Sequence, residues 1–246
     1  MDQNCTPEQH SVGRSLLLHL LPGVLIGAAY FALVPIFHRW GFPSIMALMC
    51  TIFLVLLPVE LGYLFYAGKK LNGRFSLKGV VSYRVPIPTW QYFVWVPGLF
   101  LLLGLIFAVM KPMDAFFQRQ FFAWIPTLES GLKAGYSRGA LIVAYIFTAI
   151  FGAVVGPTVE EMYFRGYLLP RMGYAGKWAP LLHSFLFGLY HVWTPWMFLT
   201  RTLGMLPLAY AVRWRNLNLS IIVHFLVNIL DVVSGVVFIV AMSAHA

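Results

Sequence analysis

Residues 139–170 read GALIVAYIFTAIFGAVVGPTVEEMYFRGYLLP, and this stretch decides the kind of fold to expect. The run is longer than the roughly 20 residues that an apolar helix needs to cross a bilayer. The glycine–proline step at 156–157 predicts either one tilted helix or a helix followed by a re-entrant turn. Beyond that step the run carries Glu160, Glu161 and Arg165. Charged groups at membrane depth cost about 2.5–3.5 kcal/mol each even on the lenient insertion scale, so they persist where they are paired or useful.

The rest of the chain is equally apolar. Of its 246 residues, 60% are hydrophobic and only 10% are charged, whereas a soluble domain has roughly 25% charged residues. So few charges cannot coat a soluble globule of this size, which leaves lipid as the solvent. Further apolar runs lie at 15–37, 43–67, 91–110, 178–193, 195–212 and 217–242. We therefore expect an all-α, polytopic transmembrane helix bundle of about seven or eight helices, forming a single membrane-embedded domain over residues 1–246.

An eighth crossing would have to lie in 112–130. Aromatic side chains alternate there with Arg119 and Glu129, which favours a helix lying along the membrane surface. The net charge of +9 is assigned to basic loops that face an anionic leaflet, and not to nucleic acid binding. If all seven runs cross, most Lys and Arg residues lie on the N-terminal side, including the basic loop 68–84 with Arg84. This asymmetry predicts a cytoplasmic N-terminus.

The charged residues of the long run have unequal partners. Glu161 and Arg165 are one turn apart on the same helix face, with the acid N-terminal to the base, so this pair can neutralise itself. Glu160 points about 100° away and has no helical partner of its own. The next run carries Phe187 and His191 at the same four-residue spacing.

The last run places His224, Asn228 and Asp231 on one helix face. Depth can be measured from the nearest basic residue at the membrane face that holds the N-terminus, namely Arg171, Lys177 and Arg215 respectively. On this measure Glu160 lies roughly 16 Å deep, His191 roughly 21 Å and His224 roughly 14 Å. Because these depths agree, the three runs predict one buried site within the membrane core, opened from the cytoplasmic side.

Such a site suits the activation of water. A carboxylate in a low-dielectric site becomes a competent general base, and a neutral His nearby can hold the water or share its proton. A second His together with an Asn can stabilise an oxyanion through N–H donors. Each piece also has a structural alternative, because a glutamate–arginine pair can staple a helix and a histidine can bridge two helices. Glu60 and His183, which also lie in apolar runs, are interpreted as structural.

Three motifs resemble those of the CPBP family, the CaaX proteases and bacteriocin-processing enzymes, also called the Abi family. Residues 160–165 look like its EExxxR motif, 187–191 like FxxxH and 224–228 like HxxxN. They occur in the family's order and on separate apolar runs. The motif-bearing core is therefore placed at about 138–242.

The resemblance implies an intramembrane endopeptidase of the glutamate type that needs no cofactor. As catalytic residues it implies Glu160, His191, His224 and Asn228, and as supporting residues Glu161, Arg165 and Phe187. Glu160 would activate water with help from His191, while His224 and Asn228 would form the oxyanion hole. The implied substrate is a peptide or lipidated protein, either a prenylated C-terminus that loses three residues or a bacteriocin-type precursor linked to self-immunity. The implied location is a cell membrane, prokaryotic for many family members.

Two alternatives stay open on the same residues. A zinc protease would use Glu161, His191 and His224 as ligands, although Arg165 beside Glu161 would compete with a cation. A non-catalytic membrane immunity or scaffold protein would use the buried charges only to hold helices together. The convergence of Glu160 with the two histidines in space would favour the protease.

Overall fold

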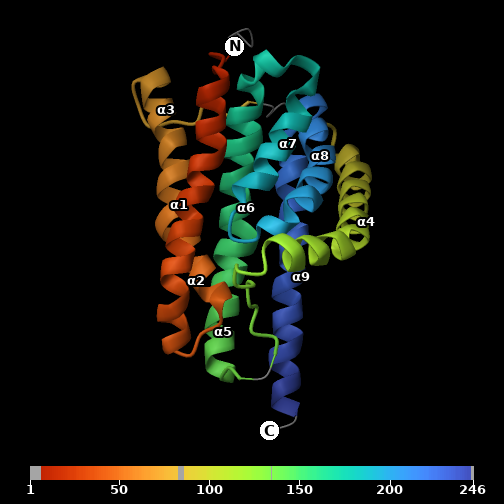
Figure 1. The fold of residues 1–246 in the computed structure, drawn as a ribbon. Helices are drawn as coiled ribbons and strands as arrows, with labels where there is room; N and C mark the ends of the chain where they lie inside the picture. Colours follow the sequence, from red (N-terminus) through yellow and green to blue (C-terminus); the bar gives the residue numbers. More distant parts are fainter. Residues whose placement is uncertain (1–6, 83–85, 134, 245–246) are drawn as a thin grey trace.

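The computed structural model describes residues 7–82, 86–133 and 135–244, and that part of the chain is helical without strands (Figure 1). The helices in it that are long and apolar enough to cross a membrane are Val12–Arg39, Ser44–Asn72, Thr89–Phe121, Arg138–Arg171 and Leu217–Met242. The predicted fold class, an all-α membrane bundle, is confirmed. Arg84 of the predicted basic loop lies outside the described residues.

The elements follow the apolar runs closely. The first helix is α1 (Val12–Arg39), and the second is continuous through α2 (Ser44–Thr51), a π-helical stretch (Ile52–Leu61) and α3 (Gly62–Asn72). After α4 (Thr89–Phe121), the longest helix comprises α5 (Arg138–Phe147), a π stretch (Thr148–Val155), α6 (Gly156–Glu160), a second π stretch (Glu161–Leu168) and a 3-10 turn (Leu169–Arg171). The remaining helices are α7 (Ala179–Tyr190), α8 (Phe198–Trp214) and α9 (Leu217–Ala244), with 3-10 turns at Gly173–Trp178 and Pro195–Met197.

The run 139–170 is one continuous helix, which resolves the two alternatives left open for it. Its glycine–proline step lies at the start of α6, directly after a π-helical stretch. Proline cannot donate to the carbonyl one turn earlier, and its ring crowds that carbonyl. The wider π turn accommodates this defect without ending the helix, and such π turns are frequent at functional sites. The second helix has the same combination, because Pro58 lies inside its own π stretch.

The prediction of a separate surface helix at 112–130 is wrong. α4 continues through Pro112 to Phe121, and it changes direction along its course so that its last part runs across the bundle (Figure 1). A proline within a helix commonly produces such a kink. The residues that follow, from Phe122 to Ser137, contain no helix among those described.

The two short helices α7 and α8 correspond to the predicted crossings 178–193 and 195–212. They contain 12 and 17 residues, fewer than the roughly 20 needed to span a bilayer. They lie tightly together, since a Cβ on Gly188 of α7 would come within 2.5 Å of the carbonyl oxygen of Phe198. The end of α7 is buried, with Tyr190 fully inaccessible. α7 therefore carries its C-terminal residues into the bundle interior.

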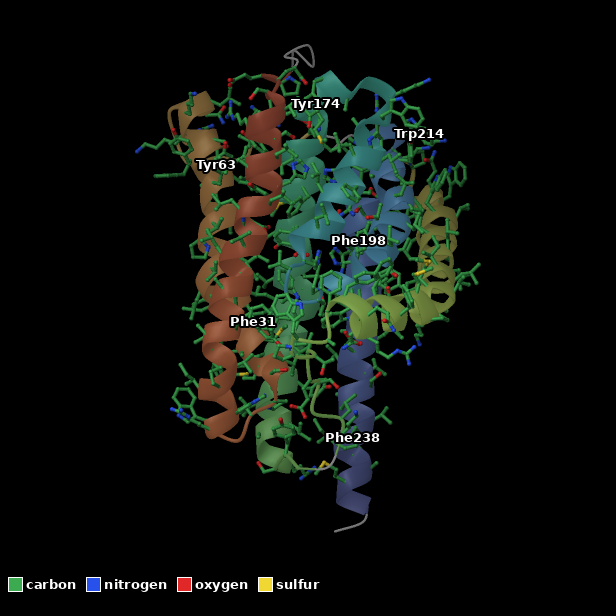
Figure 2. The ribbon with its side chains drawn as sticks, viewed as in Figure 1. Phe31, Tyr63, Tyr174, Phe198, Trp214 and Phe238 are labelled. Atoms are coloured by element: carbon green, nitrogen blue, oxygen red, sulfur yellow. The ribbon has the colours of Figure 1, made fainter. Side chains whose placement is uncertain are left out.

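The outer surfaces of α4 and α9 are apolar and exposed. Leu101 and Val109 of α4 and Val237 of α9 have exposed fractions of 68%, 67% and 63%. An exposed apolar surface of this kind is what lipid covers in an integral membrane protein. Along the bundle, Trp214 lies near the end where α1 begins and Phe238 lies towards the other end (Figure 2).

Candidate active site

Of the two adjacent glutamates, Glu161 is the one whose carboxylate is fully hydrogen-bonded. It begins the second π stretch and has no exposed surface. Arg165, one turn later and equally buried, donates Nη1–H to its Oε1 atom, which confirms the predicted ion pair. From α9, Ser220 donates its hydroxyl to Oε2, and Nδ1 of His224 lies 2.9 Å from Oε1. Both oxygen atoms of Glu161 are therefore engaged by hydrogen-bond donors.

Glu160 has very different surroundings. It ends α6, and only 7% of its surface is exposed. The Tyr190 hydroxyl lies 3.2 Å from its Oε1, and its Oε2 lies 3.9 Å from Nε2 of His224. Arg201 of α8 interacts with it electrostatically from further away. The 100° offset between adjacent helical residues thus separates a saturated carboxylate from one that retains acceptor capacity.

His224 lies between the two glutamates and contacts both. Because Glu161 can only accept at this position, the short contact assigns the proton of His224 to Nδ1. The Nε2 atom, which faces Glu160, then carries a proton only in the imidazolium form. In that form His224 can donate from Nε2 towards the space beside Glu160.

His191 presents the same neutral tautomer as His224, with its proton on Nδ1. It caps the C-terminal end of α7, and its Nδ1 atom lies 2.9 Å from the carbonyl oxygen of Phe187. That contact assigns the proton to Nδ1 and leaves Nε2 as an acceptor. His191 also lies within electrostatic range of His224, Arg165 and Arg201. A neutral His with an available Nε2 can accept a hydrogen bond from a water molecule.

Phe187 connects the arginine to this histidine. Its ring centroid lies 4.9 Å from the guanidinium carbon of Arg165 and 4.8 Å from the ring centroid of His191. The cation–π and edge-to-face contacts orient both neighbours at once. The four-residue spacing of Phe187 and His191 therefore lets the Phe187 ring contact both Arg165 and His191.

Asn228 lies one turn beyond His224 on α9 but is held differently. Its Nδ2 donates to the carbonyl oxygen of Gly152, at a distance of 2.8 Å. That carbonyl belongs to the π stretch at Thr148–Val155. An amide nitrogen has two hydrogens, so the second N–H of Asn228 can still serve another acceptor.

Several residues of this cluster could not be identified from motif spacing. Tyr190 bonds two carboxylates, Ser220 bonds Glu161, and Arg201 donates to the carbonyl oxygen of Thr194 at 3.1 Å. One signal was visible for Ser220, which stands four residues before His224 and so shares its helix face. Glu60 stood out as an ionisable residue in an apolar run, although nothing in the sequence connects it to this site.

In their present arrangement, Glu161, His191 and His224 do not form the predicted zinc site. Among the residues that the structure describes, no group of three or more His, Cys, Asp or Glu residues could hold a metal ion. Glu161 already accepts from Arg165 and Ser220, and its contact with His224 uses the Nδ1 proton. A metal would need those oxygen atoms free of donors.

The comparisons with known proteins agree with the motifs. Residues 141–230 match the family model described as type II CAAX prenyl endopeptidase Rce1-like. The matched segment contains all three predicted motifs, and it confirms the resemblance to the CPBP family. The match supports, in general terms, a CAAX-type intramembrane protease. No curated protein and no solved structure is significantly similar to the chain.

Proposed function

We propose that this protein is an intramembrane endopeptidase in which Glu160 activates the water that hydrolyses a peptide bond. The observation that carries the proposal is the contrast between two adjacent glutamates. Glu161 is saturated by Arg165, Ser220 and His224. Within the described part of the chain, Glu160 has one hydrogen-bond partner, Tyr190, so it retains lone pairs for a water molecule.

The proposed reaction begins with a water molecule held between Glu160 and Nε2 of His191. Glu160 removes one proton from the water as its oxygen attacks the carbonyl carbon of the substrate. The oxyanion that forms accepts hydrogen bonds from Nε2–H of His224, which is present in its imidazolium form, and from the second N–H of Asn228. The proton on Glu160 then passes to the nitrogen of the leaving amine as the C–N bond breaks. Both the water proton and the charge are accounted for within the site.

The family match makes a prenylated C-terminal peptide the preferred substrate class. The matching family is described as a CAAX prenyl endopeptidase, and a lipidated peptide would reach a buried membrane site from the bilayer. The exposed fractions of Glu160, His191 and His224 are 7%, 9% and 4%. Substrate access therefore requires the surrounding helices to move apart.

The test is cleavage of an internally quenched peptide that ends in a farnesylated CaaX sequence, with the purified full chain in detergent. Glu160→Gln should lower kcat by about 10²–10⁴-fold, the usual contribution of a general base. Glu129→Gln, which changes a glutamate that contacts Tyr136 and His38 and none of the site residues, is the matched control and should keep its activity. Full activity in a folded Glu160→Gln variant would contradict the proposal.

Two further arms of the same assay address the alternatives. The unprenylated peptide should be cleaved more slowly if lipid recognition matters, whereas equal rates would favour a bacteriocin-type peptide. Activity should survive removal of metal by a chelator, whereas loss of activity with recovery on zinc addition would favour the zinc mechanism. A purely structural role predicts no cleavage by the folded wild-type protein and only changed stability in His191→Ala.

A further inference from the structure

Glu60 is a buried carboxylate for which neither the motifs nor the proposed reaction gives a role. It lies in the π stretch of the second helix, and none of its surface is exposed. One oxygen, Oε1, lies 2.7 Å from the Tyr190 hydroxyl, and the other, Oε2, has no hydrogen-bond partner among the described residues. The described ion pairs also include none with Glu60. An ionised carboxylate in this position would be a buried charge without compensation.

The Tyr190 hydroxyl joins Glu60 to Glu160. Its oxygen lies 2.7 Å from Oε1 of Glu60 and 3.2 Å from Oε1 of Glu160. A phenol has one proton, so it can donate to only one of the two carboxyl groups. The other contact is a hydrogen bond only if that carboxyl group is protonated and donates to the phenol oxygen. The three groups therefore hold two protons and one negative charge.

The surrounding charges decide where the negative charge resides. Glu160 faces His224 and lies within electrostatic range of Arg165 and Arg201, and its neighbour Glu161 is already paired with donors. The charged or titratable groups that act on Glu60 are Glu160 and Tyr190, with Tyr163 also nearby. Among the described residues, these groups include no cation. The negative charge is therefore more stable on Glu160, and the proton is more stable on Glu60.

We propose that Glu60 is a positioning residue of the site, a neutral acid that holds the proton of the trio and, through Tyr190, keeps Glu160 ionised and oriented. In this arrangement Glu60 donates to the Tyr190 oxygen, and Tyr190 donates to Oε1 of Glu160. In the alternative state Glu60 carries the charge and Glu160 carries the proton, and two protons shift together to restore the proposed state. The Glu160 proton moves to the Tyr190 oxygen as the Tyr190 proton moves to Glu60, so no proton enters or leaves the trio. The proposal rests on the proposed function, because it explains how the base is prepared.

The first experiment compares substitutions in the cleavage assay with the farnesylated peptide. Glu60→Met and Tyr190→Phe should each lower kcat by about ten- to a hundredfold with little change in KM, and the double variant should be no worse than either. Glu60→Gln should rescue most of the Glu60→Met loss, since an amide N–H can still donate to the Tyr190 oxygen. Tyr163→Phe is the matched control: it removes a buried hydroxyl that donates to the Leu18 carbonyl at 2.8 Å and not to Glu60 or Glu160.

The second experiment reads the proton directly and does not depend on activity. Infrared spectroscopy of the full chain in detergent should show the carbonyl band of a protonated carboxyl group at neutral pH. That band should disappear in Glu60→Gln and remain in Glu129→Gln. Persistence of the band in Glu60→Gln, or a failure of Gln to rescue Met in folded protein, would overturn the proposal. An active Glu160→Gln variant would instead contradict the proposed function and leave the infrared result unaffected.

Discussion

Arg165 is the residue whose loss should cost the most stability. It is fully buried, donates to Glu161 and packs on the ring of Phe187. Arg165→Met would leave the charge of Glu161 without its main partner in a low-dielectric interior. Removing one partner of a buried ion pair typically lowers the free energy of unfolding by about 3–5 kcal/mol. Thermal or denaturant unfolding of the purified protein in detergent measures the change.

The control for this prediction removes both charges. Glu161→Gln combined with Arg165→Met leaves no isolated charge, so the double variant should recover a large part of the lost stability. If the single and double variants unfold at the same temperature as wild type, the pair does not contribute to stability as the structure implies.

Local geometry explains why some site residues were predictable at this scale. The different surroundings of Glu160 and Glu161 follow from their angular offset on one helix, and the structure confirms the Glu161–Arg165 pair. Tyr190 and Glu60 could not be connected in advance, because 130 positions separate them in the chain. Asn228 was expected beside His224 as an oxyanion donor, and the structure shows its amide bonded to Gly152. Its catalytic role stays a prediction.

The contact between α1 and the end of α7 positions the site at the scale of whole elements. A Cβ on Gly23 of α1 would lie 2.0 Å from the carbonyl oxygen of Tyr190. Gly23→Ala must therefore push α7 away from α1 and displace Tyr190 from its carboxylate partners. We expect a loss of about 1–3 kcal/mol in the free energy of unfolding, together with reduced peptide cleavage.

A matched glycine substitution separates this effect from helix propensity. Gly104 lies in α4, and a Cβ there would meet no atom within 4 Å. Gly104→Ala should be neutral or slightly stabilising, because alanine is the better helix former by roughly 1 kcal/mol. Equal unfolding temperatures and activities for the two alanine variants would contradict the proposed close approach of α1 and α7.

The segment before α1 should make stability depend on pH. His10 donates its backbone N–H to the carbonyl oxygen of Arg171 at 3.0 Å, and its side chain is buried. Burial, reinforced by the charges of Arg14 and Arg171, lowers the pKa of His10 from 6.5 to about 4. Between these values the unfolded chain binds a proton that the folded chain does not. The contribution of His10 to the free energy of unfolding should therefore be fully present above pH 6.5 and be lost as the pH is lowered towards about 4.

This prediction is checked by the melting temperature in detergent across that pH range. His10→Gln should flatten the pH dependence, because glutamine does not titrate. An unchanged slope in His10→Gln would assign the pH dependence to other groups.

The start of α1 and the end of α9 lie at opposite ends of the bundle (Figure 1). The predicted orientation places the N-terminus and the basic loop 68–84 in the cytoplasm, so the C-terminus should lie across the membrane. Reporter fusions in that loop and after α9 should therefore report opposite compartments. Neutral substitutions of Lys69, Lys70, Arg74 and Lys78 should weaken the orientation, because positive charges retain loops in the cytoplasm. Reporters on the same side would contradict this topology.

Composition and helical periodicity by themselves determined the membrane environment, the all-helical fold and the close pair of Glu161 and Arg165. These features depend on hydrophobicity summed along a segment and on neighbours one turn apart, which any helix of this sequence would have. Only the tertiary structure decided that α7 ends inside the bundle, that His224 contacts both glutamates, and that Tyr190 joins Glu160 to Glu60. Such contacts depend on the packing of helices that are distant in the chain, and no local pattern records which buried polar groups that packing will bring together.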